Sequence, residues 1–215
     1  TEHVGHAREM VAQLPFGEGD AICGIGGDGT MHELVNGLMS RKPEVRPPLT
    51  LLPGGTGNSF LQDLGCLDPT EVLKRLVGQT SRSIDLFEVT VGGTTRYGFN
   101  IVGWGLLSSA NQLAESMRWL GRRRYDVAAL VRLFINRRYR ATLEVDEETI
   151  EDEFTFLAAC NTVHTGEGMK LAPKAVLNDG QLELIYLKQA TRLNMLRLFA
   201  KLGNGGHLGA PGIHY

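Results

Sequence analysis

The N-terminal part of the chain alternates between segments with helical and with strand-like spacing of apolar side chains. Apolar residues recur every three or four positions at 3–14 and 31–40, which predicts amphipathic helices. Shorter helices are expected at 59–64 and at 69–77, where Asp68-Pro69 is a helix start signal. Continuous apolar runs at 21–25 and 49–52 predict strands. Because helices that alternate with strands are typical of a parallel sheet covered by helices, we expect an α/β domain here.

The pattern changes near residue 83, and strand-like segments dominate the rest of the chain. These segments are 84–91, 95–102, 140–145, 153–160 and 181–187. A helical stretch over 106–136 interrupts the strands, and a last helix is expected at 191–202. We therefore expect two domains, an α/β domain over 1–88 and an antiparallel β domain with a helical insert over 89–215.

Composition and charge exclude some classes of protein. The 215 residues are 42% hydrophobic and 21% charged, which is an ordinary globular composition. A net charge of -2 argues against a general nucleic-acid binder. Three cysteines without CxxC spacing indicate reduced, buried thiols in an intracellular protein. With no signal peptide and no bilayer-spanning apolar run, we expect a cytoplasmic protein whose membrane contact is peripheral.

Two glycine-rich loops follow the two predicted strands of the first domain. They are Gly26-Gly27-Asp28-Gly29-Thr30 and Gly54-Gly55-Thr56-Gly57-Asn58. Glycines let the backbone bend sharply and approach a ligand, and a helix that starts beyond such a loop directs free N–H groups at an anion. Two loops on neighbouring parallel strands therefore predict a phosphate cradle. The carboxylate of Asp28 at that place favours phosphoryl transfer, although an Asp in such a turn can also simply cap the following helix.

Other known phosphate motifs fit less well. Residues 24–29 satisfy GxGxxG, but no acidic residue ends the next strand to hold a ribose, and Asp28 would repel a pyrophosphate. No GK[ST] follows, which excludes a P-loop. The histidines His32, His164 and His207 share no metal-ligand spacing. Asp179-Gly180 indicates a tight turn.

Two charged segments have alternative interpretations. Residues 144–153 hold seven acidic side chains in ten, which indicates a solvated hairpin. Arg118, Arg122, Arg123 and Arg124 cluster in the helical insert, where they form either a solvated helix face or a phosphate-binding group. Arg118 and Arg124 are six residues apart and do not share one helix face. An irregular segment would have to bring both side chains to one phosphate group.

The pair GGDGT and PGGTGN, about 25 residues apart, resembles the diacylglycerol kinase-like lipid kinases, which include sphingosine kinases and bacterial diacylglycerol kinases. Further similar segments are Thr1-Glu2 with His6-Ala7, the helix 31–38, Trp104-Gly105, Arg118, Leu120-Gly121, Arg124 and 179–186. The last of these, with the residues from Trp104 to Arg124, looks most like the sphingosine kinase branch. The resemblance covers nearly the whole chain.

This resemblance implies an N-terminal α/β nucleotide-binding domain akin to NAD kinases and phosphofructokinases, followed by a β-sandwich that holds a lipid. ATP with Mg²⁺ would phosphorylate the primary hydroxyl of a sphingoid base, a ceramide or a diacylglycerol. Partners would be that lipid at a membrane surface and ATP, without nucleic acid, and a homodimer is left open.

The resemblance also implies roles for individual residues. Asp28 would be the catalytic base or align the lipid hydroxyl, and could bind magnesium through water, with Gly29 beside the substrate. The nucleotide would contact Thr1, Gly26, Gly27, Gly29, Thr30, Gly55, Thr56, Asn58, Arg118 and Arg124. A metal would bind Asp179 and the backbone carbonyls of Val176 and Gln181. Asp85, near the domain boundary, would belong to this polar network or to a hinge.

The chain departs from the family pattern in three places. Asn111, with Ser109 two residues before it, stands where sphingosine kinases carry an acidic residue for the sphingoid head group. A neutral amide can hydrogen-bond a hydroxyl but cannot pair with an ammonium, which argues against a sphingoid base and leaves ceramide or diacylglycerol open. The family's opening strand and its late Asp-Gly-Glu segment are not in this sequence, so we expect the chain alone to be less active than its parent protein.

Two other functions remain open from the sequence. An NAD kinase-type enzyme for a soluble substrate shares GGDGT but lacks the loop over 54–58. A non-catalytic lipid- or nucleotide-binding domain would not need Asp28, Arg118 and Arg124, all of which are present.

Overall fold

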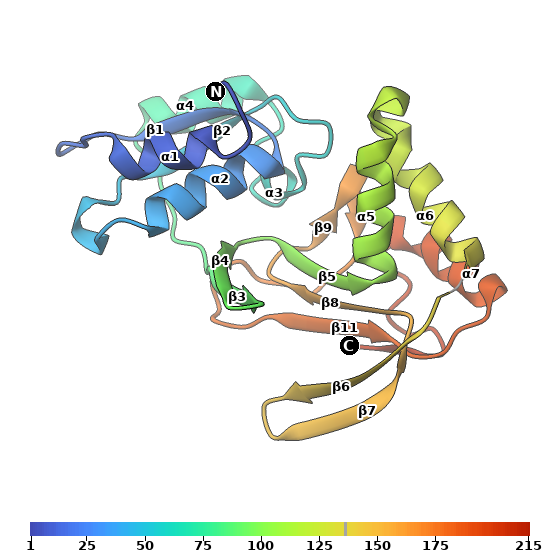
Figure 1. Cartoon of the computed structure of the whole chain (residues 1–215). Helices are drawn as coiled ribbons and strands as arrows, with labels where there is room; N and C mark the ends of the chain where they lie inside the picture. The colour runs from blue at the N-terminus through green and yellow to red at the C-terminus, as the bar shows by residue number, and fades with distance from the viewer. Residues whose placement is uncertain (136) are drawn as a thin grey trace. The chain divides into compact units, whose positions relative to one another are not determined.

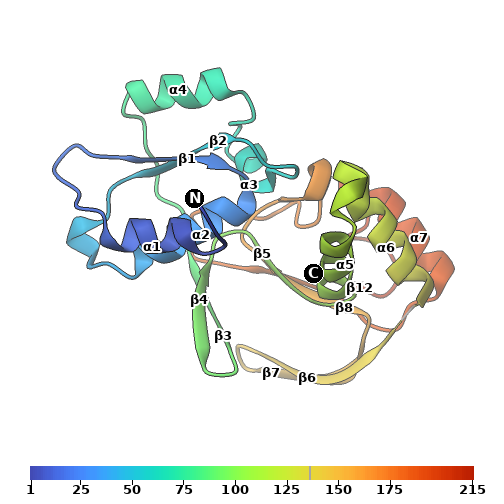
Figure 2. The ribbon, with the colours of Figure 1, turned by 45° about the horizontal axis from the view of Figure 1, so that its top comes forward.

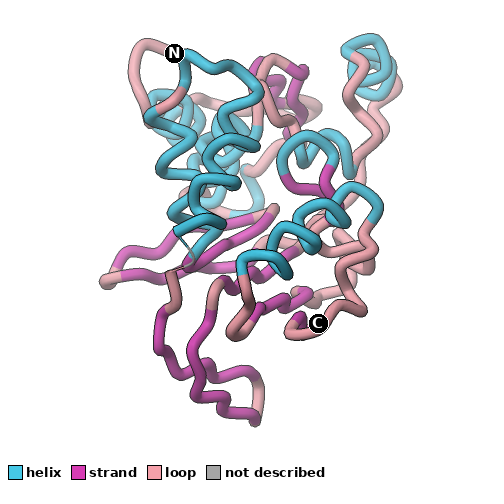
Figure 3. Tube along the Cα trace, turned by 90° about the vertical axis from the view of Figure 1, so that its right-hand side faces the viewer, coloured by secondary structure: helices cyan, strands magenta, loops and turns pink. Residues whose placement is uncertain are grey.

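The computed structural model describes residues 1–135 and 137–215, and their side chains except those at 118, 122, 123, 125, 126, 133, 134 and 167 (Figure 1). The chain forms two compact units. The first contains Thr1–Asn100 and Leu177–Gly180, and the second contains Ile101–Val176 and Gln181–Tyr215. Figure 3 shows how helices and strands are distributed along the trace.

The first unit is built on two parallel strands with helices on both faces. Its elements are α1 (His6–Gln13), β1 (Ile22–Gly26), α2 (Asp28–Met39), the 3-10 turn η1 (Pro43–Val45), β2 (Leu49–Pro53), α3 (Ser59–Asp63), α4 (Pro69–Val77), β3 (Phe87–Val91) and β4 (Thr94–Gly98). The register of β1 and β2 runs from Ile22 opposite Leu49 to Gly26 opposite Pro53. Figure 2 shows α4 across the sheet from α1 and α2. The expected α/β architecture is confirmed.

The core of this unit lies where α2 packs on the sheet. Met31, Leu34 and Val35 of α2 are buried there with Leu51 of β2. A Cβ at Gly24 of β1 would lie 2.6 Å from Leu34 Cδ1, so a glycine lets the helix approach the strand. The helical spacing of apolar residues that predicted α2 therefore marks the face that is buried.

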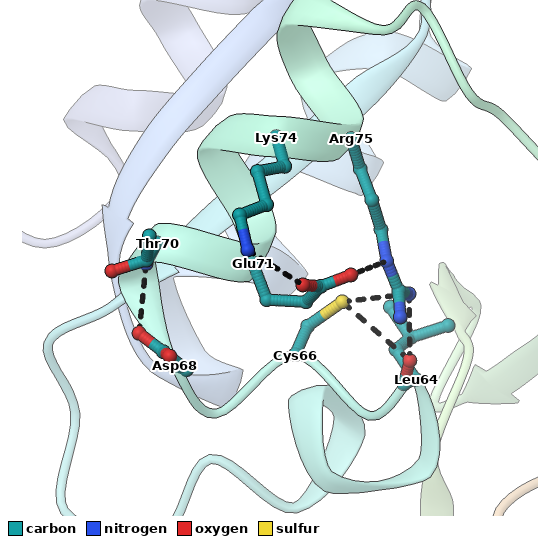
Figure 4. A network of polar contacts seen from close by, with 7 residues as sticks. All are labelled: Leu64, Cys66, Asp68, Thr70, Glu71, Lys74 and Arg75. Atoms are coloured by element: carbon teal, nitrogen blue, oxygen red, sulfur yellow. Dashed lines mark hydrogen bonds and ion pairs between the residues drawn. The ribbon is translucent and has the colours of Figure 1, made fainter.

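Polar contacts fix the corner between α3 and α4 (Figure 4). Asp68 caps α4 by accepting the Thr70 N–H at 2.9 Å, as the Asp-Pro start of this helix favours. The Arg75 guanidinium donates to the Leu64 carbonyl at 2.9 Å and lies 3.0 Å from the buried Cys66 Sγ. The segment that leaves the second glycine loop is thereby anchored to α4.

The second unit is mainly antiparallel. Its strands are β5 (Ile101–Gly105), β6 (Tyr139–Val145), β7 (Glu148–Phe154), β8 (Phe156–Cys160), β9 (His164–Thr165), β10 (Met169–Lys170), β11 (Glu183–Leu187) and β12 (Ile213–His214). Its helices are α5 (Leu106–Ser116), η2 (Arg118–Arg123), α6 (Arg124–Ile135), η3 (Gly166–Gly168), α7 (Arg192–Lys201) and η4 (Leu202–Asn204). One antiparallel sheet has the order β12-β11-β8-β5. The acidic residues 144–153 span the β6–β7 hairpin, as predicted.

Two predicted strands prove to be divided. The segment 153–160 breaks at Thr155, which is buried and donates its N–H to the Leu187 carbonyl at 2.8 Å and its hydroxyl to the Lys188 carbonyl at 2.9 Å. The segment 95–102 breaks between β4 and β5, where the first unit ends at Asn100. Apolar content continues through both breaks, so the pattern alone could not reveal them.

Other elements also differ from the sequence expectation. The predicted helix 31–40 begins earlier, at Asp28. The helical insert is interrupted by η2, in which Gly121 has φ 59° and ψ -133°, values that favour glycine. The short strands β9, β10 and β12 have two residues each, too few to show a pattern. Among the described residues, no helix is both long and apolar enough to cross a membrane.

His207 is a buried imidazole of the second unit, with 1% of its surface exposed. Its Nε2 lies 2.9 Å from the Leu171 carbonyl oxygen, which can only accept, so Nε2 carries the proton. Within the described part of the chain, its Nδ1 is buried without a hydrogen-bond partner. Burial lowers the pKa of His207 below its ordinary value.

Acidification is expected to destabilise the protein through His207. As the pH falls below about 6.5, the unfolded chain protonates this residue before the folded state does, so the free energy of unfolding falls until the pH passes the lower folded-state pKa. The variant His207→Gln keeps an N–H donor for Leu171 and does not titrate. Urea unfolding between about pH 7 and 5 should show a shallower loss of stability in this variant. An equally steep loss would contradict the role of His207.

Candidate functional site

The structure brings the two glycine loops together at the carboxyl edge of the β1–β2 sheet. Gly54 donates its N–H to the Gly26 carbonyl at 2.7 Å, which extends the parallel pairing into the loops. Beyond it, a Cβ at Gly55 would lie 2.5 Å from the Gly27 Cα, and a Cβ at Gly27 would lie 2.9 Å from the Gly55 Cα. The loops therefore touch backbone to backbone, and no side chain fits between them.

The N-terminus of α2 opens from this contact without a cap. Its N-cap residue, Gly27, provides no side-chain hydrogen bond. The N–H groups of the first turn have no acceptor within the helix, and the helix dipole makes this end attractive to an anion. A Cβ at Gly29 would meet no atom within 4 Å, so the space beside this turn is open. The free N–H groups of the first turn therefore face the open side of the loop, where an anion would be attracted.

The carboxylate of Asp28 connects the two loops. Its Oδ2 accepts the Ser59 N–H at 3.0 Å and its Oδ1 accepts the Phe60 N–H at 3.0 Å. These residues begin α3, so Asp28 caps the helix that follows the second loop and not its own helix. Each carboxylate oxygen keeps a further lone pair for a hydroxyl or a metal-bound water.

Asn58 shapes the second loop. It has φ 48°, a left-handed conformation that asparagine adopts more readily than most residues, and its Nδ2 donates to the Gly55 carbonyl at 3.0 Å. Its Oδ1 is buried without a partner among the atoms that the structure describes. Thr56 of the same loop is exposed. In the first loop, the Thr30 hydroxyl occupies the space that a Cβ at Gly26 would need.

Sequence reasoning missed three residues of α2 that hold its neighbours. Asn36 donates to the Tyr97 carbonyl and accepts the Tyr97 N–H, both at 2.9 Å, which fastens α2 to β4. A Cβ at Gly37 would lie 2.5 Å from the Arg8 carbonyl oxygen of α1. Glu33 contacts the start of α1. A signal for these contacts was present in the sequence. Positions 33, 36 and 37 share one face of the helix, and their polar or small residues mark a face that contacts other elements.

His32 also lies on α2, but its environment does not indicate a metal ligand. Burial and, to a lesser degree, the nearby Arg96 lower its pKa, while Glu33 opposes them. Within the described part of the chain, no group of three or more His, Cys, Asp or Glu side chains is placed to hold a metal ion.

The predicted residues of the helical insert belong to the second unit. Arg124 Nη2 lies 3.4 Å from Glu115 Oε1, and its side chain is 12% exposed. The backbone of Arg118 lies in η2, and its side chain is outside the described residues. Gly121 interrupts the helical path between the two arginines, so they do not belong to one regular helix. Asn111 is exposed on α5.

Helices α5 and α6 of the second unit run side by side (Figures 1 and 2). Residues of both helices line a cavity of about 220 Å³. Its polar lining includes Ser109, Gln112, Arg132 and Arg137. Arg132 Nε donates to the Ser109 carbonyl at 3.2 Å. Among the described side chains that line it, none is a carboxylate. Electrostatically, this cavity disfavours an ammonium group.

The residues predicted to bind a metal lie in and beside the turn 177–180, which belongs to the first unit. Asp85 donates its N–H to the Leu177 carbonyl at 2.7 Å, and its Oδ2 accepts the Gly180 N–H at 2.7 Å. Gly180 has φ 75°, as expected for the tight turn predicted at Asp179-Gly180. Asp179 is exposed, and Val176 and Gln181 belong to the second unit. Thr1, the remaining predicted nucleotide contact, is exposed ahead of α1.

Comparison with known proteins agrees with this architecture. Residues 1–89 match the family model of the diacylglycerol kinase catalytic domain, and residues 100–215 match that of the YegS C-terminal NAD kinase beta sandwich-like domain. A crystal structure of a protein from Bacillus anthracis str. Sterne, described as a diacylglycerol kinase, superimposes with a TM-score of 0.75 at 24% identity, covering 100% of this chain and 68% of that one. The fold is that of a diacylglycerol kinase catalytic domain followed by a YegS C-terminal NAD kinase beta sandwich-like domain.

Curated relatives extend the comparison. Sphingosine kinase 1 of Arabidopsis thaliana is 27% identical over 264 residues, covering 100% of this chain and 54% of that protein. Diacylglycerol kinase of Bacillus subtilis (strain 168) is 30% identical over 220 residues, covering 100% of this chain and 70% of that protein. The chain thus belongs to the diacylglycerol kinase family of lipid kinases. It spans about half the length of its plant relatives.

Proposed function

We propose that this chain is the catalytic part of an ATP-dependent lipid kinase, which transfers the γ-phosphate of ATP to the primary hydroxyl of a lipid. One observation carries the proposal. The backbone contact between Gly27 and Gly55 sets an uncapped helix N-terminus, with open space at Gly29, beside the carboxylate of Asp28. Phosphoryl transfer needs mainly positioning and charge neutralisation, and this arrangement supplies both.

Main-chain groups of the cradle are proposed to hold the ATP phosphates. The donors are Gly26, Gly27, Gly29, Thr30, Gly55, Thr56 and Asn58, with Thr1 as a further contact. Their backbone N–H groups are fixed before ATP binds, so little reorganisation is needed. Arg124 and Arg118 are proposed to add guanidinium donors, which match phosphate oxygens in pairs.

Asp28 is proposed to align the lipid hydroxyl and accept its proton as the hydroxyl oxygen bonds to the γ-phosphorus, the bond from that phosphorus to the bridging oxygen breaks, and ADP leaves. The two N–H groups of α3 that its oxygens accept support this role, because they fix the carboxylate before the substrate arrives. The remaining lone pairs are available to the hydroxyl beside Gly29.

Magnesium fits the same chemistry. Asp28 could hold it through water, and Asp179 with the carbonyls of Val176 and Gln181 offers the oxygen ligands that this ion prefers. The exposed carboxylate of Asp179, next to the turn that Asp85 fixes, is the observation that supports the fit. When bound, Mg²⁺ would neutralise negative charge on the phosphates.

The lipid is proposed to be a neutral alcohol, a diacylglycerol or a ceramide, rather than a sphingoid base. Ser109 lines a cavity that also holds Arg132 and Arg137, and Asn111 is a neutral amide on the same helix. An ammonium would find no counter-ion among the described residues that line this cavity.

We further propose that the enzyme is cytoplasmic and meets its substrate by peripheral membrane contact. A homodimer is compatible with this proposal.

A lipid panel tests this function directly. Full-length protein is incubated with labelled ATP, Mg²⁺ and vesicles containing diacylglycerol, ceramide or sphingosine, with NAD as a soluble acceptor in a separate arm. We expect labelled phospholipid from diacylglycerol or ceramide, and at least about tenfold less from sphingosine. Product from NAD alone would indicate a soluble-substrate kinase. Tight ATP binding without any product would indicate a non-catalytic domain, and either outcome would refute the proposal.

A further inference from the structure

Helix α1 is held at its start by a side chain from α2. Glu33 accepts the Gly5 N–H at 2.8 Å and the Ala7 N–H at 3.2 Å, one with each carboxylate oxygen. The helix has no cap of its own, because its N-cap residue is Gly5, in a left-handed conformation with φ 89°. Glu33 of α2 therefore accepts the hydrogen bonds that the N-cap side chain of α1 would normally accept.

A second side chain holds the other end of α1. The Arg41 Nη1 lies 3.0, 3.1 and 2.8 Å from the carbonyl oxygens of Val11, Ala12 and Leu14. These carbonyls have no N–H donor within the helix, so Arg41 supplies their hydrogen bonds. Glu33 does the same for the free N–H groups at the N-terminal end. The two residues form a matched pair of caps on one helix.

The order of these contacts shows that α1 and α2 run parallel. Glu33 meets the start of α1, Gly37 meets its middle at Arg8, and Arg41 meets its end. The N-termini of both helices thus lie at the same end of the first unit. Glu33 is five residues beyond Asp28, or about 7.5 Å along the helix axis. Gly5, which Glu33 holds, therefore lies toward the end of α2 at which Asp28 and the first glycine loop are found.

The segment 1–4 is tied to the first turn of α1 by hydrogen bonds and a ring contact. The Glu2 N–H donates to His6 Nδ1 at 3.0 Å, and the His6 N–H donates to the His3 carbonyl at 3.2 Å. The rings of His3 and His6 stack at 4.7 Å. A change in the position of the first turn of α1 therefore changes the position of residues 1–4.

We propose that Glu33 is a positioning residue for nucleotide binding, which sets the segment 1–5 against the phosphate cradle as its third wall. The inference rests on the proposed function and adds a residue to it. Glu33 does not touch the nucleotide; it acts through the amides of Gly5 and Ala7. A glutamine at this position can accept at one atom only, and its NH2 group would face the other amide.

The variants Glu33→Gln and Arg41→Ala separate positioning from stability. Both loosen α1, so both should lower the melting temperature of the full-length protein. Only Glu33→Gln is expected to raise the KM for ATP, by about tenfold, with kcat and the KM for lipid within about twofold of wild type. Arg41→Ala should leave all three kinetic constants within about twofold.

Each outcome decides the inference. If Glu33→Gln melts lower but keeps the wild-type KM for ATP, Glu33 is only a structural cap and the proposal fails. If Arg41→Ala raises the KM equally, general loosening of α1 explains the effect and the proposal also fails. If the wild-type protein neither binds ATP nor phosphorylates a lipid, the proposed function itself fails. The wild-type measurement alone shows this, so it is distinguished from a failure of the inference about Glu33.

Discussion

Replacing Asp28 with asparagine is expected to lower kcat for lipid phosphorylation by at least about a hundredfold, while ATP binding changes by less than about threefold. An asparagine can still accept a hydrogen bond from the lipid hydroxyl, but it cannot take the proton, and proton transfer of this kind contributes about 10²–10⁴ in rate. Initial rates measured over a range of ATP and lipid concentrations, with ATP binding by calorimetry, check both parts.

The capping role of Asp28 makes a stability control necessary. In Asp28→Asn one oxygen still accepts an amide of α3, whereas the NH2 group faces the other, at a cost of about 1 kcal/mol. That corresponds to a melting point about 2–4 °C lower in a chain of this size. Arg41→Ala, which loosens α1 instead, should lose stability and keep kcat. A folded Asp28→Asn protein with kcat within threefold of wild type would mean that Asp28 only caps α3.

Local patterns predicted the parts of this protein that short stretches of sequence determine. The parallel strands at 22–26 and 49–53 follow from apolar runs, and α4 from Asp68-Pro69. The glycine loops follow from the same strands, since a parallel pair must deliver both loops to one edge. The adjacency of the loops was therefore predictable before any contact was known.

Contacts between distant residues could not be predicted in the same way. Asp28 was expected to serve a ligand or cap its own helix, yet it caps α3, 31 residues further along. Glu33 caps α1 from 28 residues away. An acidic side chain on a helix looks the same in the sequence whether it faces water or another helix terminus. The same limitation hid the break at Thr155, which depends on contacts with Leu187 and Lys188.

Gly55→Ala is expected to damage both the fold and ATP binding. The new methyl group would lie 2.5 Å from the Gly27 Cα and 2.8 Å from Asn58 Oδ1, so the two loops must separate. Forcing backbone apart in a packed region costs about 1–3 kcal/mol, and the displaced amides would weaken ATP binding by at least about tenfold. Thermal unfolding and calorimetric titration with ATP measure the two losses. Retained ATP affinity would mean that the contact between the loops does not shape the nucleotide site.

Gly29→Ala is expected to raise the stability of the protein and to weaken ATP binding. A Cβ here meets no protein atom within 4 Å, and Gly29 lies in the first turn of α2, where alanine is favoured over glycine by about 0.5–1 kcal/mol. The melting temperature without nucleotide should therefore rise. If ATP phosphate occupies that open space, the methyl group must displace it, and the Kd for ATP should increase by about tenfold or more. A glycine needed only for folding would not combine higher stability with weaker ATP binding when replaced by alanine. A Gly29→Ala protein that is more stable and binds ATP as tightly as wild type would show that the phosphates do not occupy this space.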